Sequence, residues 1–452
     1  MTPLETLAEW ASGVTCADVP AEQHKLVRAR LLDTLGLIAV AADHPAGRSV
    51  MAWAAGNAGT GATLLPNGAH ATPAVAALVH GSLAHARDFD DTFPDTVVHP
   101  GSTVIAAALA AAQASDASFD DLSTAIVVGY EVAARLGAVA GRGFHARGFH
   151  ATSVVGPIAS AATAGRLRGL ECAQMADALG LATSMSGGLL AFLADGGWSK
   201  WLHTGWAAHG GVIAAELASH GFHGPHHALD HRYGLYGAFL ATPDVDLGAI
   251  TAGLGQTWLG AGARPKRYPC AHVIEPYIDA ALSWRAEGRV SGDTVQSVRC
   301  FLAPWALPIV AEPRAIKLAP KSDLDAIASL PFMVAAALCD GRVDLATLRD
   351  ETRDRSDIQA LAARVACEGD ATLGSGFDGR IVAVTARGDR IDRNVALSAA
   401  SEQRIVEKFL ANTGHLERGV CTQLEAALLD GKLATRALVQ LAKAAMTSGK
   451  GA

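Results

Sequence analysis

Apolar residues recur at helical spacing along roughly the first 250 positions of the chain. Behind a start signal at Pro20, for example, Val27, Leu31 and Leu35 stand four residues apart, a pattern typical of an amphipathic helix over 20–42. Similar patterns, separated by Gly, Pro or Asp, predict further helices over residues 70–92, 102–114, 120–139, 152–166, 172–186 and 199–220. We therefore expect this part of the chain to form a helical bundle.

The pattern changes after Gly260, where short runs show partial alternation between turn residues. These runs predict β-strands at 295–303, 363–369 and 380–388, with a helix over 329–341 between them. From Ser401 onward the spacing is helical again. The prediction is a mainly α protein, with an all-helical domain of residues 1–261 and 396–452 and a smaller α+β domain of residues 262–395.

Composition and charge fit this fold class and narrow the range of partners. Hydrophobic residues make up 50% of the 452 positions and aromatic residues only 6%, which favours closely packed helices. The 37 basic and 44 acidic side chains give a formal net charge of −7, and no basic run could follow a phosphate backbone. We therefore expect no nucleic-acid partner, and an anionic substrate would be held by individual cations or helix N-termini.

The cysteines and the apolar stretches indicate in which cellular compartment we expect the protein. The seven cysteines are scattered without a CxxC pair, which favours a reducing compartment and argues against a structural zinc or iron–sulfur site. The first residues do not form a signal-peptide pattern, and apolar stretches such as VIAAALAAAQA are too short and too alanine-rich to cross a bilayer. The expectation is a soluble, cytoplasmic protein without a membrane partner.

The segment 85–103 is unusually polar for an alanine-rich region. His85, Asp88 and Thr92 stand at i, i+3 and i+7, so a helix ending near Pro94 would present all three on one face. Such side chains can simply satisfy helix ends. However, two histidines, four aspartates and two threonines occur between positions 85 and 99, and this density of polar groups favours a functional site.

His99 lies in a loop just before the next expected helix, which would start at residues 100–102. The free N–H groups of a helix start favour an anion, so a substrate carboxylate could dock beside His99. The alternative is that His99 is an ordinary loop histidine.

Two further segments carry candidate groups. A glycine-rich loop offers His145 and His150 before a helix expected near Thr152; either imidazole can shuttle a proton, and helix capping is the alternative. Lys200 and His203 share a helix face among three tryptophans, where the lysine can pair with a substrate carboxylate unless it is simply exposed.

The remaining candidates are weaker. Lys266 and Tyr268 stand two residues apart at the expected domain junction, where ligand clefts tend to form. A histidine-rich stretch over 220–231 raises the question of a metal site. A Gly-Pro turn breaks the regular spacing that helical metal sites use, so we predict a solvated loop there and no metal.

Eight strings, in this order, resemble the MmgE/PrpD family over nearly the whole chain: HARDFDDTF…HPGS, VVGYEVAARLG, GFHATSVVGP, SKWLHTGWAAHGG, HGFHGP, KRYPC…IDAAL, SLPFMVAAALCDG and VEKF. The resemblance implies that the N-terminal part and the C-terminal helices form one domain, with the α+β domain inserted as a lid, usually in a homodimer. Family members include 2-methylcitrate dehydratase, cis-aconitate decarboxylase and iminodisuccinate epimerase. None requires a metal or an organic cofactor, and all act on small acids with two or three carboxylates.

The resemblance also implies which residues line a cleft between the two domains: Asp88, Thr92, His99, His150, Lys200 and Lys266. In this reading the lysines and Thr92 hold carboxylates, and we expect Tyr268 to be a further substrate-binding residue. His99 or His150 adds or removes a proton, and Asp88 orients a histidine or shares its charge.

Three departures leave the substrate open. The loop from Thr92 to His99 is one residue longer than in the related decarboxylases, HPG replaces HPS, and Glu275 stands where many members have histidine. We predict a cofactor-independent lyase, a dehydratase or decarboxylase, for a di- or tricarboxylic acid of the 2-methylcitrate or cis-aconitate type. An epimerase of a dicarboxylic amino or imino acid such as iminodisuccinate is the alternative, and a non-catalytic polycarboxylate-binding protein is the second.

Overall fold

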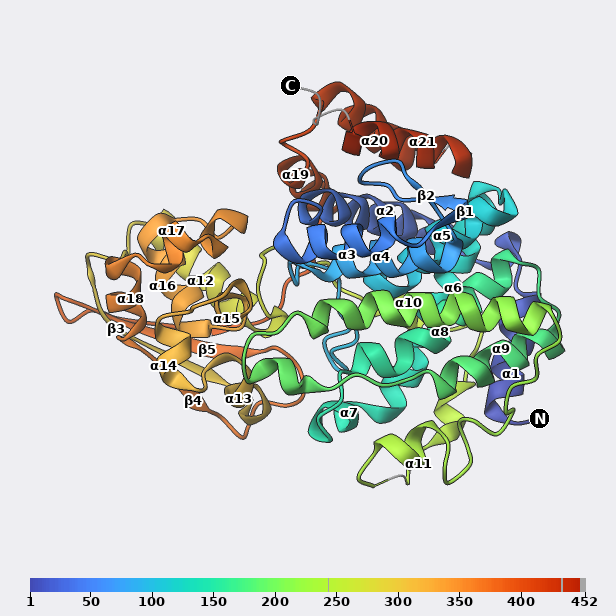
Figure 1. The fold of residues 1–452 in the computed structure, drawn as a ribbon. Coiled ribbons are helices and arrows are strands. Elements are labelled where there is room, and N and C mark those ends of the chain that lie inside the picture. The colour runs from blue at the N-terminus through green and yellow to red at the C-terminus, as the bar shows by residue number, and fades with distance from the viewer. Residues whose placement is uncertain (243, 432–433, 448–452) are drawn as a thin grey trace. The chain divides into compact units, whose positions relative to one another are not determined.

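The computed structural model describes residues 1–242, 244–431 and 434–447 (Figure 1). It is mainly helical, with 59% helix and 9% strand, as the apolar spacing predicts. The chain forms two compact units. The first comprises Met1–Phe192, Gly197–Pro265 and the C-terminal helices from Ser401 on, and the second comprises Leu193–Gly196 and Lys266–Ala400.

The first unit consists of helices and one small antiparallel sheet of two strands, β1 (Ala58–Thr63) and β2 (His70–Ala71). Its helices are α1 (Pro3–Gly13), α2 (Ala21–Ala41), α3 (Pro45–Ala55), α4 (Pro73–His85), α5 (Gly101–Ser115), α6 (Phe119–Ala140), α7 (Gly143–Ala146), α8 (Ala151–Leu167), α9 (Cys172–Ser184), α10 (Ser199–Ser219), α11 (Leu235–Phe239), α19 (Glu402–Asn412), α20 (Arg418–Asp430) and α21 (Thr435–Thr447).

Helix α10 packs lengthwise against α4 and α8 (Figure 1). The α4–α10 contact is made backbone to backbone, because a Cβ on Gly205 would overlap the carbonyl oxygen of Leu78, and one on Gly81 would lie 2.8 Å from the Cα of Gly205. Small residues therefore bring the start of α10 close to the end of α4, and both ends carry site residues.

Helix α6 is the one helix of the described residues that is long and apolar enough to cross a membrane, yet 89% of its apolar window is buried in the structure. Two buried charged residues of α6, Glu131 and Arg135, also pair with each other. The buried Arg135 donates to Glu131 Oε1 at 2.7 Å and to the carbonyl oxygens of Ile250, Ala252 and Thr257. The composition of α6 is therefore that of a core helix.

The helix predicted over residues 70–92 is wrong at its C-terminal end. Helix α4 stops at His85, and Asp88 then takes a left-handed conformation with φ of 46°. Thr92 instead pairs with Arg264 in an isolated bridge, with N···O distances of 3.0 and 2.8 Å. His85, Asp88 and Thr92 thus do not share a helix face, because this turn and bridge satisfy the backbone without any helical period.

A C-terminal helix anchors this turn. Lys408 of α19 lies 2.7 Å from the carboxylate of Asp33 in α2 and donates to the carbonyl oxygen of Phe89 at 2.6 Å. All three groups are in the first unit. The chain that follows the second unit therefore returns to hold the segment between α4 and α5 in place.

The second unit is a four-stranded sheet with helices, and the strand order is β4-β3-β5-β6. Strand β3 is parallel to β4 and antiparallel to β5, which is antiparallel to β6. The elements are α12 (Glu275–Ala286), β3 (Val295–Leu302), α13 (Leu307–Val310), α14 (Arg314–Leu318), α15 (Asp323–Ile327), α16 (Leu330–Asp340), α17 (Asp350–Arg353), α18 (Ser356–Ala362), β4 (Val365–Gly369), β5 (Gly379–Thr385) and β6 (Arg390–Val395). The three predicted strands are confirmed, whereas β6 was missed because its sequence, RIDRNV, is mostly charged and polar.

Candidate active site

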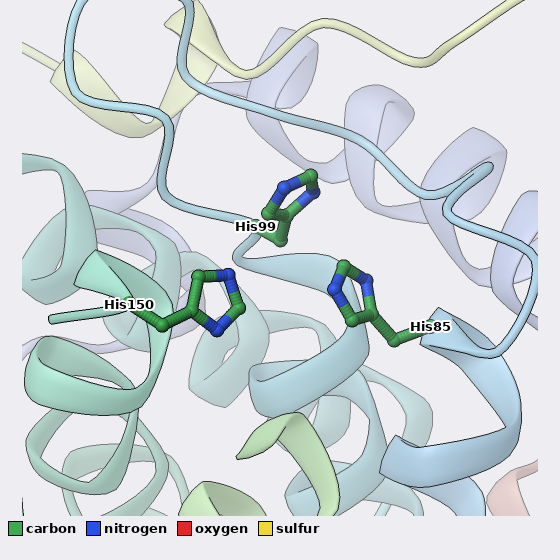
Figure 2. A group of neighbouring side chains, drawn as sticks. All are labelled: His85, His99 and His150. Carbon is green, nitrogen blue, oxygen red and sulfur yellow. The ribbon is translucent and has the colours of Figure 1, made fainter. Parts of the chain in front are cut away.

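Three buried histidines from three separate segments meet in the first unit (Figure 2). His85 is the last residue of α4, His99 precedes the start of α5, and His150 is the N-cap of α8. Their ring centroids are 4.6 Å apart for His85 and His99, 5.8 Å for His85 and His150, and 6.1 Å for His99 and His150. The starts predicted for α5 and α8 are confirmed, and they place two of the three rings.

Asp90 is the carboxylate that fixes two of these rings. Both of its oxygens lie 2.9 Å from His85 Nδ1, and one lies 3.3 Å from His99 Nδ1. Burial alone would raise the pKa of Asp90, but the two imidazoles hold that pKa well below its usual value. Asp90 is therefore an anion that keeps a proton on the Nδ1 atom of His85.

The surroundings of His99 favour the same tautomer. Its Nδ1 lies 3.1 Å from the carbonyl oxygen of Asp91 and 3.2 Å from Thr92 Oγ1, in addition to Asp90. A carbonyl and a carboxylate can only accept, so Nδ1 carries the proton and Nε2 presents a lone pair. This arrangement makes Nε2 the atom of His99 that can exchange a proton with a substrate.

Three histidines around His85 and His99, namely His145, His150 and His203, are held in the neutral form. Burial is the main reason that the pKa of His150 lies well below its usual value, and the charge of Lys200 adds to the effect. Burial likewise lowers the pKa of His145 to about 3 and that of His203 to about 4. A bound anion would raise these pKa values again, so a carboxylate substrate would itself prepare the imidazoles to take up protons.

Lys200 is paired with a carboxylate of the protein. Its Nζ donates to Asp88 Oδ2, and the side chains of Lys200 and Asp88 are 12% and 4% exposed. On the same helix, His203 Nδ1 lies 3.3 Å from His150 Nδ1, so the predicted shared face of Lys200 and His203 is directed to the histidine cluster. Asp88, expected to orient a histidine, has Lys200 as its ion-pair partner.

The start of α5 beside His99 is filled by Asp91. The Gly101 N–H donates to Asp91 Oδ1 at 2.8 Å, and the hydroxyl of Tyr130 donates to Oδ2 at 2.7 Å. Burial raises the pKa of Asp91 to about 6. The prediction that a free N–H group at this helix start would receive a substrate carboxylate is therefore wrong for Gly101, because the side chain of Asp91 already accepts its hydrogen bond.

Lys266 and Tyr268 belong to the second unit, and both are buried. The hydroxyl of Tyr268 donates to Asp279 at 2.9 Å. Glu275, fully buried, accepts from the backbone N–H groups of Arg267 at 2.5 Å and Tyr268 at 3.1 Å. Glu275 thus fixes the backbone next to Lys266, a structural reason for an acid at this position.

The histidine-rich stretch over 220–231 is a largely exposed loop, as predicted. His223 and His227 are mostly exposed, with 89% and 71% of their side-chain surface accessible. His226 bridges Glu5 and Asp177, with both distances at 3.1 Å. Among the described residues, the groups with metal-ligand geometry do not include this loop.

Sequence reasoning missed Asp90 and undervalued His85. The run DFDD offers three carboxylates within four positions, and only the turn after α4 decides which of them meets the imidazoles. A helical wheel selects Asp88, whereas the observed backbone selects Asp90. The five-residue separation of His85 and Asp90 is itself the only signal, and it is not specific.

Two sequence profiles match this chain: the MmgE/PrpD N-terminal domain over residues 5–248 and the MmgE/PrpD C-terminal domain over residues 268–427. Among curated proteins, the chain is 33% identical to the cis-aconitate decarboxylase of Homo sapiens over 309 residues, 66% of this chain and 61% of that protein. It is 27% identical to the cis-aconitate decarboxylase of Aspergillus terreus over 286 residues, 61% of this chain and 58% of that protein. It is also 27% identical to the cis-aconitate decarboxylase-like protein oryM of Aspergillus oryzae over 311 residues, 65% of this chain and 64% of that protein. The matches thus span less than two thirds of the length of these relatives.

Proposed function

The chain belongs to the MmgE/PrpD family, and on this premise we propose that it is a lyase acting by proton transfer on a small di- or tricarboxylic acid of the cis-aconitate type. The observation that carries the proposal is the buried pair of imidazoles, His99 and His150, with Lys200 beside them. Two of the relatives are named cis-aconitate decarboxylase, which supports decarboxylation rather than dehydration. In this proposal the protein's own side chains supply the chemistry without a cofactor.

The proposed steps need one proton carrier and one group that holds carboxylates. A substrate carboxylate competes with Asp88 for Lys200, and its charge raises the pKa of the nearby imidazoles. In decarboxylation, the C–C bond to one carboxylate breaks, CO2 leaves, and the electron pair stays on carbon until an imidazolium of His99 or His150 donates its proton. In dehydration, the neutral imidazole instead takes a proton from carbon while hydroxide leaves.

The other predicted residues take supporting roles in the proposal. Thr92 Oγ1 lies 3.2 Å from His99 Nδ1, so Thr92 steadies the imidazole as well as any substrate. Lys266 and Tyr268 remain predicted substrate contacts from the second unit. An arrangement as a homodimer also remains a proposal, carried by family resemblance.

One experiment separates the candidate reactions. The protein is incubated in deuterated water with cis-aconitate, 2-methylcitrate and iminodisuccinate, and each mixture is followed by proton NMR. A product of cis-aconitate that has lost CO2 and gained deuterium on carbon identifies a decarboxylase, and a new alkene signal from 2-methylcitrate, which has no C=C bond of its own, identifies a dehydratase. Deuterium gain without a change of skeleton identifies the epimerase, and absence of any reaction or exchange contradicts the enzyme proposal and favours the binding protein.

The active acid is then used to test the site. We expect His99→Ala and Lys266→Ala each to lower kcat/KM by at least about 10²-fold, because one loses the proton carrier and the other a carboxylate contact. His227→Ala, which removes an exposed imidazole, is the matched control and should leave kcat/KM unchanged. Wild-type rates for both site variants, with circular dichroism showing intact folds, would reject the assignment.

A further inference from the structure

We propose that His85, His99 and His150 bind one divalent transition-metal ion of the zinc class, and that the bound ion inhibits the enzyme. The first part stands on the geometry of the three rings alone. The second part rests on the proposed function, because it requires His99 or His150 to carry the proton.

The three rings offer converging nitrogen atoms. One ring nitrogen from each histidine lies within 4.8 Å of the other two, and Figure 2 shows the imidazoles facing one another from three backbone segments. Zinc–nitrogen bonds of 2.0–2.1 Å in a tetrahedron place the nitrogens about 3.3 Å apart. The nitrogens would therefore have to approach one another by up to about 1.5 Å on binding, which side-chain rotations can provide.

The buried Nε2 atom of His85 is an independent observation that points to a ligand at this cluster. Its side chain is 0% exposed, and within the described part of the chain Nε2 makes no hydrogen bond. The opposite nitrogen, Nδ1, is held by Asp90 at 2.9 Å. This is the carboxylate–histidine pair that commonly stands behind a metal ligand, where the carboxylate fixes the ring and makes its free nitrogen a better donor.

The donor set determines the class of ion. Three imidazoles suit Zn²⁺, Co²⁺, Ni²⁺ or Cu²⁺, whereas Mg²⁺ and Ca²⁺ prefer oxygen ligands. Asp90 balances part of the charge of the ion, and the fourth position stays open for water or an anion.

A second set of groups occupies the same space. His85, Asp88, Asp90 and His99 also have ligand atoms within 4.8 Å of one another. A metal ion bound by that set would compete with the ion pair between Asp88 and Lys200 and with the hydrogen bond between Asp90 and His85. The three-histidine set leaves both carboxylates with their partners, and for this reason we favour it.

We expect inhibition because the metal ion and the substrate proton would use the same imidazole nitrogen atoms. A metal ion bound to His99 and His150 occupies the lone pairs that would exchange a proton with the substrate. Proton transfer and metal binding therefore exclude one another at this cluster.

Binding is tested without reference to activity. Chelator-treated full-length protein is titrated with Zn²⁺ in a calorimeter and with Co²⁺ in a visible spectrometer, where four-coordinate Co²⁺ gives strong d–d bands. We expect one tight site per chain for Zn²⁺, no comparable site for Mg²⁺, and an affinity at least about 10-fold weaker in His85→Gln and His150→Gln. The double variant His223→Gln/His227→Gln removes the exposed histidines and should bind as the wild type does.

Each outcome decides one part of the proposal. The metal site is overturned if no stoichiometric binding is found. It is also overturned if the double variant His223→Gln/His227→Gln loses binding while His85→Gln and His150→Gln keep it. Binding without inhibition of turnover by equimolar Zn²⁺ overturns the regulatory part alone. Binding in a protein that turns over none of the acids sustains the metal site and counts against the proposed function.

Discussion

Asp90 shows how one carboxylate can set the chemistry of two imidazoles. It is 2% exposed, bonds to Nδ1 of His85, and lies 3.3 Å from Nδ1 of His99. Its negative charge favours a proton on Nδ1 of both rings. Replacement by asparagine keeps the shape but removes this charge and permits the other tautomer of each ring.

We therefore predict that Asp90→Asn lowers kcat by about 10²–10⁴-fold. Steady-state rates of the variant and the wild type check this expectation. Asp95→Asn, at an exposed acid of the same segment, is the control and should leave kcat unchanged; a loss of equal size there, or a wild-type kcat for Asp90→Asn, would contradict the role.

At this scale the sequence identifies the segment in which polar side chains gather, but not which of those side chains contact one another. The density of polar groups over 85–103 and the helix starts after His99 and His150 are readable because they rest on local composition and turn chemistry. The choice of Asp90 rather than Asp88 depends on a left-handed residue and on a bridge to position 264, far away in the chain. Such long-range backbone pairing leaves no periodic signal.

At the scale of elements, the close contact of α4 and α10 positions Lys200 and His203. We predict that Gly205→Ala destabilises the first unit by about 1–3 kcal/mol, because the added methyl group overlaps the backbone of α4. The helix should move outward and lower the activity as well. Urea unfolding and kcat/KM measure the two effects.

Gly210 on the same helix is the matched control. A Cβ there meets only Met185, at 3.5 Å from Sδ and 3.6 Å from Cβ, which is ordinary contact. Gly210→Ala should therefore be neutral or stabilise by up to about 1 kcal/mol, since alanine loses less entropy in a helix. Equal losses of stability in the two variants would refute the close-contact explanation.

The helices α2, α5, α6, α8, α9 and α10 are predicted close to their observed bounds, because the helical spacing of apolar residues and the Gly, Pro and Asp breaks between helices are local signals, whereas α1 and α3 were not predicted. The three strands at 295–303, 363–369 and 380–388 are found for a similar reason, since each is apolar and bounded by turns. Strand β6 is different: its residues are mostly charged, and it becomes a strand only by pairing with β5. Tertiary pairing overrides composition there.

For the whole molecule, buried titratable groups give the two units opposite responses to acid. In the first unit, burial lowers the pKa of His80 from 6.5 to about 4, and the pKa values of His145 and His203 are lowered similarly. The unfolded chain then takes up protons first, so stability is lost as the pH falls from 6.5 to 4. Asp91, with its pKa raised to about 6, opposes this loss only in part.

In the second unit, burial raises the pKa of Glu275 from 4.5 to about 7. The folded form then binds the proton first, so the stability of this unit increases as the pH falls from 7 to 4.5. At about 1.4 kcal/mol per pH unit, the changes in the pKa of His80 and of Glu275 each correspond to about 3–4 kcal/mol at most. We predict that a change from pH 7 to pH 5 lowers the urea midpoint of the first unit and raises that of the second.

Urea titration with pulsed hydrogen exchange and mass spectrometry resolves the two units by their peptides. His80→Gln should flatten the pH dependence of the first unit alone, and Glu275→Gln that of the second alone, so each variant serves as the control for the other. Because His80 and Glu275 are each 0% exposed, neither effect depends on surface charge, and it should persist at high salt. Midpoints that move together with pH in the wild type would show that the net charge of the molecule, rather than these buried groups, governs its response to acid.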